Sequence, residues 1–203
     1  MKGWLPEDKD AAILDVGCGR GEFLRFLHLE GYVNCEGIDL AEEQVEQSKR
    51  WNLPVRCEDA LDYLKTRTCR YALITAFDFL EHLTRSEALE FLSRSREALR
   101  SGSLIMKTPN VAAPRGTHYF AGDLTHEQAY SPASLSQILR ATGFDNVEFR
   151  ETRPVPHSLA STIRSVLWRI VRAAHVLQDR IEIGGQLPVY TRNVIVRAVP
   201  IEQ

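Results

Sequence analysis

The sequence alternates short apolar runs with amphipathic stretches over roughly residues 11–110, and this alternation limits the fold more than any other feature. The apolar runs have the length and composition of buried strands, and the stretches between them have the apolar spacing of helices. Strands that alternate with helices of about 10–15 residues are typical of βαβ units with a mainly parallel sheet. Gly31 and Gly102 follow two of these helices, as C-cap glycines do. The expected strands are 12–17, 33–39, 55–59, 71–78 and 103–109, and the expected helices are 21–31, 41–51, 60–66 and 83–102.

The alternation breaks at a long irregular segment, residues 109–130, which has no clear period. A loop of this length in a compact domain is usually functional or mobile. Order returns afterwards, where Ser131 is a predicted helix N-cap and Pro132 takes the first helical position. The remaining expected elements are a helix at 131–143, a strand at 146–152, a helix at 158–181 and a last strand at 189–199.

A glycine-rich turn, LDVGCGRGEF, joins the first predicted strand to the first predicted helix. Gly17, Gly19 and Gly21 permit a tight turn and a close approach of the backbone to a ligand at a helix N-terminus. A dinucleotide fingerprint would need a glycine where Glu22 stands, and that carboxylate would repel a pyrophosphate. The acid that precedes the glycines, Asp15, instead suits a ligand with a cationic amine.

Two more acids follow the second and third predicted strands. Asp39 ends EGIDL, where a carboxylate can accept hydrogen bonds from a ribose diol. Asp59 lies in CEDA, where a carboxylate can accept one from an adenine amino group. A single acid after a strand can also serve as the cap of the next helix. Three acids in register after three strands favour a ligand site.

The stretches ILDVGCGRGEF, EGIDLAEEQVE, CEDALDYL and YALITAFDFLEHL resemble the successive motifs of the class I S-adenosylmethionine-dependent methyltransferases, over roughly residues 11–110. The resemblance implies an α/β, Rossmann-like fold: a seven-stranded, mainly parallel sheet with an antiparallel last strand and helices on both faces. It also implies one methyltransferase domain over residues 1–203. The implied cofactor contacts are Asp15, Gly17, Gly19 and Gly21 for the methionine portion, Asp39 with Leu40 for the ribose, Asp59 with Ala60 for the adenine, and Ala76 and Phe77 for the amino acid end.

The stretch FDFLEHL, residues 77–83, follows the fourth predicted strand and places three ligand-type side chains on one helical face. One interpretation is a helix start, with Asp78 as N-cap and Glu81 three positions later in a capping box. The other is a divalent-cation site made by Asp78, Glu81 and His82, because two carboxylates and an imidazole suit Mg²⁺, Mn²⁺ or Fe²⁺. Both interpretations stay open at this point.

A further metal ligand would come from the irregular segment, which contains His118, Asp123 and His126. The two acids and the histidine after the fourth strand, with a later histidine before a helix start, resemble the metal site of small-RNA 2′-O-methyltransferases. The first three positions also resemble ubiquinone-pathway O-methyltransferases. By that resemblance His126 completes the metal site. Whether a metal binds or a histidine acts directly as base, His126, His82 and Glu81 are the candidate catalytic residues.

The segments KTPN, DLTHE and SPASLSQILRATGF resemble methyltransferases associated with bacterial surface-polysaccharide and O-antigen synthesis. By that resemblance the chain is an O-methyltransferase acting on a sugar or glycan hydroxyl, with help from Mg²⁺ or Mn²⁺ because such a hydroxyl holds its proton tightly. One alternative is a small metabolite of the quinone-precursor type as acceptor. Another is a cofactor-binding module without catalysis, within a longer polysaccharide-assembly protein.

The net charge and the cysteine content indicate which class of partner and which compartment to expect for the chain. The formal net charge is −2, and the acidic balance of residues 1–149 disfavours nucleic acid as a partner. The four cysteines have no C-x-x-C spacing, no stretch resembles a secretory signal, and no apolar run approaches the roughly 20 residues of a membrane span. These features predict a cytoplasmic protein with free thiols.

The predicted helix at 158–181 stands where the fold normally has only a short connection, in a region with eight arginines against three acids over residues 150–200. A basic amphipathic helix can lie on an anionic membrane, where a lipid-linked glycan would be found. An apolar stripe more often packs on its own domain or on a second subunit, and we expect that arrangement ahead of peripheral contact with the inner face of a membrane. The stripe consists of Ile163, Val166, Leu167, Ile170, Val171, Ala174 and Leu177, with Arg164, Trp168, Arg169, Arg172 and Arg180 around it.

Overall fold

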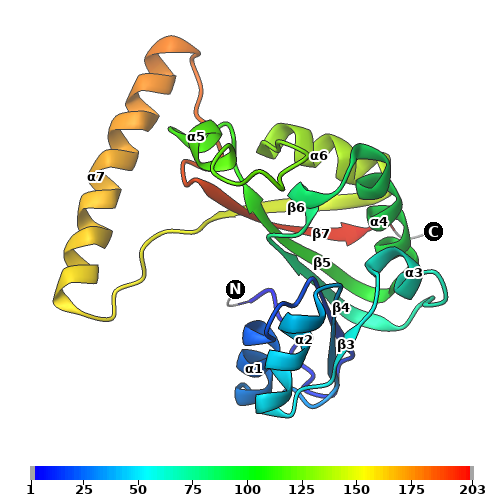
Figure 1. Cartoon of the computed structure of the whole chain (residues 1–203). Helices are drawn as coiled ribbons and strands as arrows, with labels where there is room; N and C mark the ends of the chain where they lie inside the picture. Colours follow the sequence, from blue (N-terminus) through cyan, green and yellow to red (C-terminus); the bar gives the residue numbers. More distant parts are fainter. Residues whose placement is uncertain (1–2, 202–203) are drawn as a thin grey trace.

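The computed structural model describes residues 3–201 and is built around one seven-stranded sheet in the order β3-β2-β1-β4-β5-β7-β6 (Figure 1). Neighbouring strands from β3 through β5 pair in parallel, whereas β7 pairs antiparallel with both β5 and β6. The predicted seven-stranded, mainly parallel sheet with an antiparallel last strand is therefore confirmed. The strands are β1 (Ile13–Val16), β2 (Cys35–Asp39), β3 (Val55–Cys57), β4 (Tyr71–Phe77), β5 (Leu99–Pro109), β6 (Phe144–Glu151) and β7 (Asn193–Pro200).

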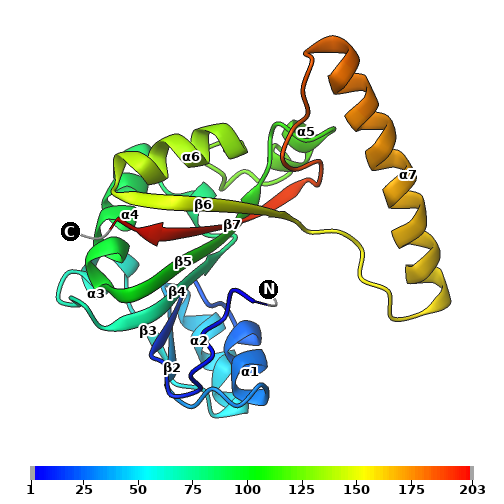
Figure 2. The ribbon, with the colours of Figure 1, turned by 180° about the vertical axis from the view of Figure 1, so that it is seen from behind.

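Helices cover both faces of the sheet (Figures 1 and 2). Neighbouring residues of a strand point to opposite faces, so Leu73 joins one apolar cluster and Ile74 the other. The larger cluster packs α3, α4 and α6 on the sheet, and the smaller one packs α1. The helical segments are α1 (Glu22–Leu29), α2 (Glu42–Ser48), η1 (Lys49–Trp51), α3 (Ala60–Leu64), η2 (Leu80–His82), α4 (Arg85–Ala98), α5 (Gly116–Phe120), α6 (Pro132–Ala141) and α7 (Leu159–Glu182).

The prediction of a helix over 83–102 followed by a strand from 103 was wrong at its boundary. Helix α4 ends at Ala98, and β5 begins at once with Leu99. Gly102 is therefore a strand residue and not a C-cap, and a Cβ there would lie 1.8 Å from the carbonyl oxygen of Ala72 on β4. Gly31, at φ 90°, does have the left-handed conformation of a C-cap glycine.

The capping interpretation of FDFLEHL was also wrong. Asp78 has a left-handed backbone, with φ 51°, and is followed by the short 3₁₀ helix η2. The capping box belongs to α4, where Thr84 accepts from the Glu87 N–H and the Glu87 carboxylate accepts from the Thr84 N–H. Farther along, the predicted N-cap Ser131 and first-turn Pro132 are confirmed at α6, and the irregular segment contains the short helix α5. The last strand begins at Asn193, later than the predicted residue 189.

Helix α7 begins and ends within one residue of its predicted range and follows its N-cap Ser158. It stands at the side of the molecule beyond the end of β6, joined to the body by the segments before and after it (Figures 1 and 2). None of the helices in residues 3–201 combines the length and hydrophobicity that crossing a bilayer requires.

Candidate functional site

The glycine-rich turn lies at the carboxyl end of β1, at the edge of the sheet where ligands of open α/β folds bind. Gly17, Gly19 and Gly21 all have positive φ, between 54° and 82°, which only glycine adopts without strain. At Gly17 the space is also limited, because a Cβ would lie 2.8 Å from the Cδ2 atom of Phe79. Both conformation and close packing therefore require glycine at this turn.

Asp39 links the end of β2 to the glycine-rich turn. Its carboxylate accepts hydrogen bonds from the backbone N–H of Gly19 at 2.7 Å and from that of Ala41 at 2.8 Å. A carboxylate has about four acceptor sites, so these two bonds leave capacity for the diol of a ribose. The turn and the predicted ribose-binding acid are thus held together before any ligand arrives.

Asp59 is the N-cap of α3, which is the alternative role that an acid after a strand can have. Its Oδ1 atom accepts from the backbone N–H groups of Leu61 and Asp62, at 2.9 and 3.0 Å. Both bonds go to the same oxygen, and the side chain is exposed at the cavity described below. Capping therefore leaves the Oδ2 atom for the predicted adenine contact, so the two roles are compatible.

Asp15 is buried in β1, with 2% of its surface exposed. Burial raises the pKa of its carboxyl to about 7; a hydrogen bond from the Thr75 hydroxyl opposes this shift, and the nearby charge of Asp39 adds to it. A buried carboxylate with so high a pKa is stabilised by a cation. This environment agrees with the predicted role of Asp15 beside a cationic amine.

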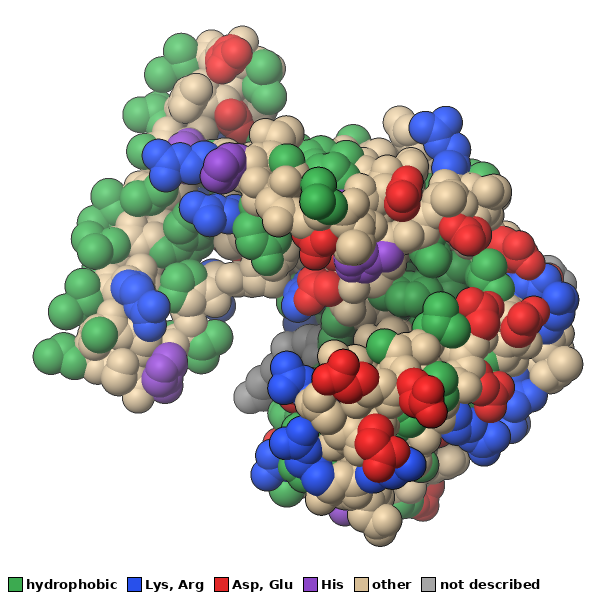
Figure 3. All heavy atoms as spheres, in the orientation of Figure 1, with side chains coloured by type: hydrophobic (Ala, Val, Ile, Leu, Met, Phe, Trp, Pro, Cys, Tyr) green, Lys and Arg blue, Asp and Glu red, His purple; other side chains and the backbone are tan. Residues whose placement is uncertain are grey.

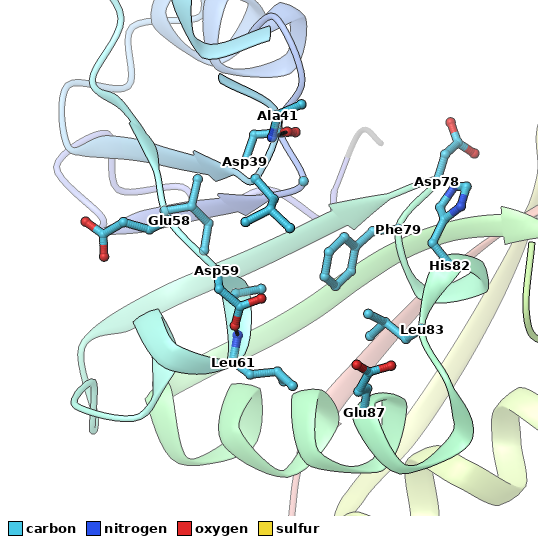
Figure 4. Close-up of a pocket in the computed structure, with 14 residues that line it drawn as sticks. Asp39, Ala41, Glu58, Asp59, Leu61, Asp78, Phe79, His82, Leu83 and Glu87 are labelled. Atoms are coloured by element: carbon cyan, nitrogen blue, oxygen red, sulfur yellow. Dashed lines mark hydrogen bonds between the residues drawn. The ribbon is translucent and has the colours of Figure 1, made fainter. Parts of the chain in front are cut away.

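A cavity of about 640 Å³ opens between the ends of β1, β2 and β3 and the residues that follow β4 (Figure 4). The Phe79 ring points into it, between the two aspartates on one side and His82 on the other. Sequence reasoning missed Phe79, Leu61 and Leu83, whose apolar side chains also line it. Of the predicted cofactor residues, Gly17, Asp39, Leu40, Asp59 and Ala60 line the cavity, whereas Asp15, Gly19, Gly21, Ala76 and Phe77 lie at the same edge of the sheet without lining it.

A second cavity, of about 510 Å³, adjoins the first and shares Asp78 and His82 with it. These two residues therefore stand between the predicted cofactor space and the second cavity. Most of its lining residues have charged or polar side chains. The lining residues are Asp78, Glu81, His82, Pro109, His118, Tyr119, Gly122, Asp123, His126 and Arg192.

Three of the four predicted metal ligands meet at this second cavity. Glu81, His82 and His126 each offer a ligand atom, and these atoms lie within 4.8 Å of one another. Asp78 is not part of the group, because its left-handed backbone turns the carboxylate to an ion pair with Lys107. The structure thus brings Glu81 and His82 together with His126 from the irregular segment, and it places Asp78 apart.

Hydrogen bonds fix the orientation of both imidazoles. The Nδ1 atom of His126 donates to the carbonyl of Phe120 at 2.8 Å, which leaves the lone pair on Nε2. The Nδ1 atom of His82 lies 3.0 Å from the hydroxyl of Thr125, whose own proton is donated to Asp123 at 2.7 Å. His82 therefore donates to that hydroxyl and also keeps its lone pair on Nε2.

Glu81 fits the role of a cation ligand. It is fully buried, and neither carboxyl oxygen has a hydrogen-bond partner in the described part of the chain. Burial raises the pKa of Glu81, as does the nearby charge of Asp78, so an ionised Glu81 needs a compensating cation. One carboxylate and two imidazoles with Nε2 lone pairs form a donor set that suits Mn²⁺ or Fe²⁺, whereas Mg²⁺ prefers oxygen ligands.

Solved structures share this architecture. A SAM-dependent methyltransferase from Archaeoglobus fulgidus is 23% identical and has a TM-score of 0.71, over 93% of this chain and 86% of that one. Phosphoethanolamine N-methyltransferase 2 of Haemonchus contortus, solved with S-adenosyl-L-methionine, is 17% identical with a TM-score of 0.66, over 100% of this chain and 51% of that one. At such identities the likeness concerns the fold. No curated protein sequence matches the chain.

The sequence itself also matches a family. The methyltransferase domain family matches residues 3–149, which hold the glycine-rich turn, the three aspartates and the residues after β4. The match covers most of the chain and includes every predicted cofactor residue. The chain therefore belongs to the methyltransferase domain family and is an S-adenosylmethionine-dependent methyltransferase.

Proposed function

We propose that this methyltransferase methylates a hydroxyl of a sugar or glycan acceptor, with the assistance of a divalent cation. The observation that carries the proposal is the second cavity, because its wall is rich in carboxylates, imidazoles and a guanidinium and shares His82 with the cofactor cavity. Sugar hydroxyls are recognised through such polar groups. An acceptor of the quinone-precursor type would favour a larger apolar wall.

The proposed reaction is an in-line displacement at the sulfonium methyl group. The carbon–sulfur bond breaks as the carbon–oxygen bond to the acceptor forms, and S-adenosylhomocysteine leaves. The acceptor hydroxyl has to lose its proton. A bound cation would lower the pKa of that hydroxyl, and without a cation the Nε2 lone pairs of His126 and His82 would be the bases next to its proposed position. The chain's main contribution is to align the two reactants.

A cation would be held by Glu81, His82 and His126, the three donors that meet at the cavity. When bound, a divalent cation such as Mn²⁺ would lower the pKa of a coordinated hydroxyl. Glu81 contributes the negative charge, and the Asp123–Thr125 pair and the Phe120 carbonyl hold the two imidazoles in the required tautomer.

Cation binding is tested by titrating Mn²⁺ into the protein and into its Glu81→Gln variant, with the ion followed by electron paramagnetic resonance. We expect one site in the parent protein and a loss of affinity of about 100-fold or more in the variant, because the ligand charge is removed. His28→Gln, at an exposed position of α1, is the matched control and should bind Mn²⁺ like the parent. If no Mn²⁺ binds and activity survives EDTA, the cation is dispensable and a histidine acts as base alone.

The acceptor is tested by mass spectrometry of products formed from labelled cofactor with a panel of glycans, quinone precursors and other hydroxylic metabolites, with and without Mn²⁺. A mass increase of one methyl group on a glycan hydroxyl supports the proposal. If only a quinone precursor is methylated, the acceptor is a small metabolite and not a glycan. Cofactor binding without turnover on any glycan would favour the module without catalysis.

A further inference from the structure

Helix α7 contacts its own domain through its polar side. Asp179 accepts from the hydroxyl of Tyr190 at 2.6 Å and from the backbone N–H of Leu187 at 3.3 Å. Arg172 donates to Glu151 of β6 at 2.7 Å. These polar contacts set the rotation of the helix about its axis, so it is not free to turn its other side inward.

The side of α7 that faces away from the domain is apolar and exposed (Figure 3). Of the two expected arrangements, packing of the apolar stripe on its own domain is therefore wrong, and packing on a second subunit stays a prediction. A surface helix normally buries this face, and a contiguous apolar area of several hundred Å² is typical of an interaction site. The exposed fractions are 51% for Ile163, 51% for Val166, 55% for Leu167, 63% for Ile170, 46% for Val171, 60% for Leu177 and 79% for Ile181.

Within this face, six residues recur at alternating steps of four and three, the spacing of a helix–helix seam. The sequence of the seam is nearly the same in both directions about Arg172. Two antiparallel copies centred there would place Ile163 opposite Ile181, Leu167 opposite Leu177, and Ile170 opposite Ala174. The seam consists of Ile163, Leu167, Ile170, Ala174, Leu177 and Ile181.

We propose that α7 is a dimerisation helix, whose outer face packs antiparallel against the same helix of a second copy of this chain. A two-fold symmetric contact requires a self-complementary surface. The seam meets that requirement, since each large side chain on one half of the helix faces an aliphatic side chain on the other.

Charge at the ends of the helix favours the antiparallel arrangement. Arg164 and Glu182 are 18 residues apart, about five turns, so they lie on the same line along the helix. Antiparallel pairing brings Arg164 of one copy beside Glu182 of the other at both ends of the contact. Parallel pairing would leave these opposite charges at opposite ends of the helix pair, about 27 Å apart.

The outer face of α7 also has a hollow that can receive a side chain of a second helix. A shallow depression of about 450 Å³ lies over the second half of α7. The spacing of its lining residues is that of the hole into which a side chain of a facing helix inserts. In the antiparallel arrangement Leu167 of the second copy reaches this position. The hollow is lined by Ala174, Leu177, Gln178, Ile181 and Glu182.

The size and composition of the face fit a second helix better than a membrane surface. Seven aliphatic side chains, each at least 46% exposed, form one face along about five turns of the helix, whereas scattered surface residues would form no such continuous patch. Helices that lie on membranes usually carry aromatic anchors on the apolar face. Here the aromatic residue, Trp168, lies on the opposite side and lines a cavity with Glu151 and Arg150 of β6.

Light scattering coupled to size-exclusion chromatography gives the first test. We expect the parent protein to have twice the 23.0 kDa mass of one chain and Leu167→Glu to be monomeric, because the substitution buries two carboxylates in the seam. Leu29→Glu, at an α1 position that is 74% exposed, is the matched control and should stay dimeric. A parent protein that is monomeric at high concentration overturns the proposal.

Cross-linking tests the orientation, in a background where the exposed Cys57 and Cys69 are replaced by serine. Mixed Leu167→Cys and Leu177→Cys proteins should form a disulfide between the two variants, as antiparallel pairing requires. Disulfides within each variant alone would contradict that orientation. Flotation with phosphatidylglycerol vesicles is the third measurement, and binding that Leu167→Glu abolishes, from a monomeric parent, would assign the face to a membrane.

Discussion

At the scale of single residues, the raised pKa of Asp15 should make cofactor binding depend on pH. Its pKa of about 7 means that the carboxyl is about half ionised at neutral pH. If the ionised form binds the cationic amine, S-adenosylmethionine should bind about fivefold more tightly at pH 7 than at pH 6. Calorimetric titration at the two pH values measures the ratio.

The control for this dependence is Asp15→Asn, which keeps the acceptor for Thr75 and removes the titrating group. It should bind cofactor weakly and almost equally at both pH values. Asp15→Asn should also change how the free energy of unfolding depends on pH. Because the folded pKa lies above the unfolded value of 3.8, the parent should lose stability as the pH rises from about 4 to about 7, and Asp15→Asn should not. An equally strong decline in the variant would assign the dependence to another group.

Part of the site that sequence reasoning identified follows from the positions of strand ends alone. Asp39 ends β2 and Asp59 follows β3 by two residues, so their meeting at one edge of a parallel sheet follows from the alternation of elements. The separation of Asp78 from Glu81 depends instead on a left-handed backbone at Asp78. A side-chain pattern at α-helical spacing assumes an α-helix, but after β4 the chain forms the short 3₁₀ helix η2 and begins the α-helix α4 only at Arg85.

At the scale of elements, the start of α4 depends on Thr84 and not on Asp78. Thr84→Ala removes the side-chain acceptor of the capping box and should lower the free energy of unfolding by about 1 kcal/mol. Asp78→Asn is the control, since asparagine also tolerates a left-handed backbone, and it should change that energy by less than about 0.5 kcal/mol. Urea denaturation distinguishes the two. The reverse order of effects would restore Asp78 as the cap.

Gly102 gives a second prediction for elements. A Cβ there would overlap the Ala72 carbonyl of the paired strand, so Gly102→Ala should separate β4 from β5 and cost at least about 3 kcal/mol. Gly31→Ala meets open space and only the strain of a positive φ, about 1 kcal/mol. Thermal denaturation of both variants checks the difference. Similar losses for the two glycines would mean that Gly102 acts as a helix cap after all.

These two cases explain why elements were predictable and some boundaries were not. The existence of a helix or strand follows from apolar period, which extends over many residues, as in 85–98. Its boundary follows from one or two local contacts. The run LRSGSL fits a helix end as well as a strand start, and pairing with β4 decides between them.

At the scale of the whole molecule, the range of α7 was predictable and its direction was not. The apolar stripe predicted a helix close to Leu159–Glu182, but it did not decide between packing on its own domain and packing on a second subunit. The side that packs is decided by a few polar residues on other elements, Glu151 and Tyr190, whose partners lie far away in the sequence. A stripe shows which face is apolar, and it does not show what covers that face.

Because α7 contributes no residue to either apolar cluster of residues 3–201, the methyltransferase body should fold without it. We expect a variant in which residues 157–187 are replaced by a short Gly-Ser linker to be monomeric, to melt within about 5 °C of the Leu167→Glu monomer, and to bind S-adenosylmethionine like the parent. The comparison with Leu167→Glu separates loss of the helix from loss of the dimer.

The linker can be short because β6 and β7, the strands that it joins, are paired up to Glu151 and Val194. Since the cofactor cavity is built from the ends of β1 to β4, its affinity for the cofactor should not depend on α7. A variant that fails to fold would mean that the contacts of Glu151 and Tyr190 with α7 hold the last two strands in place.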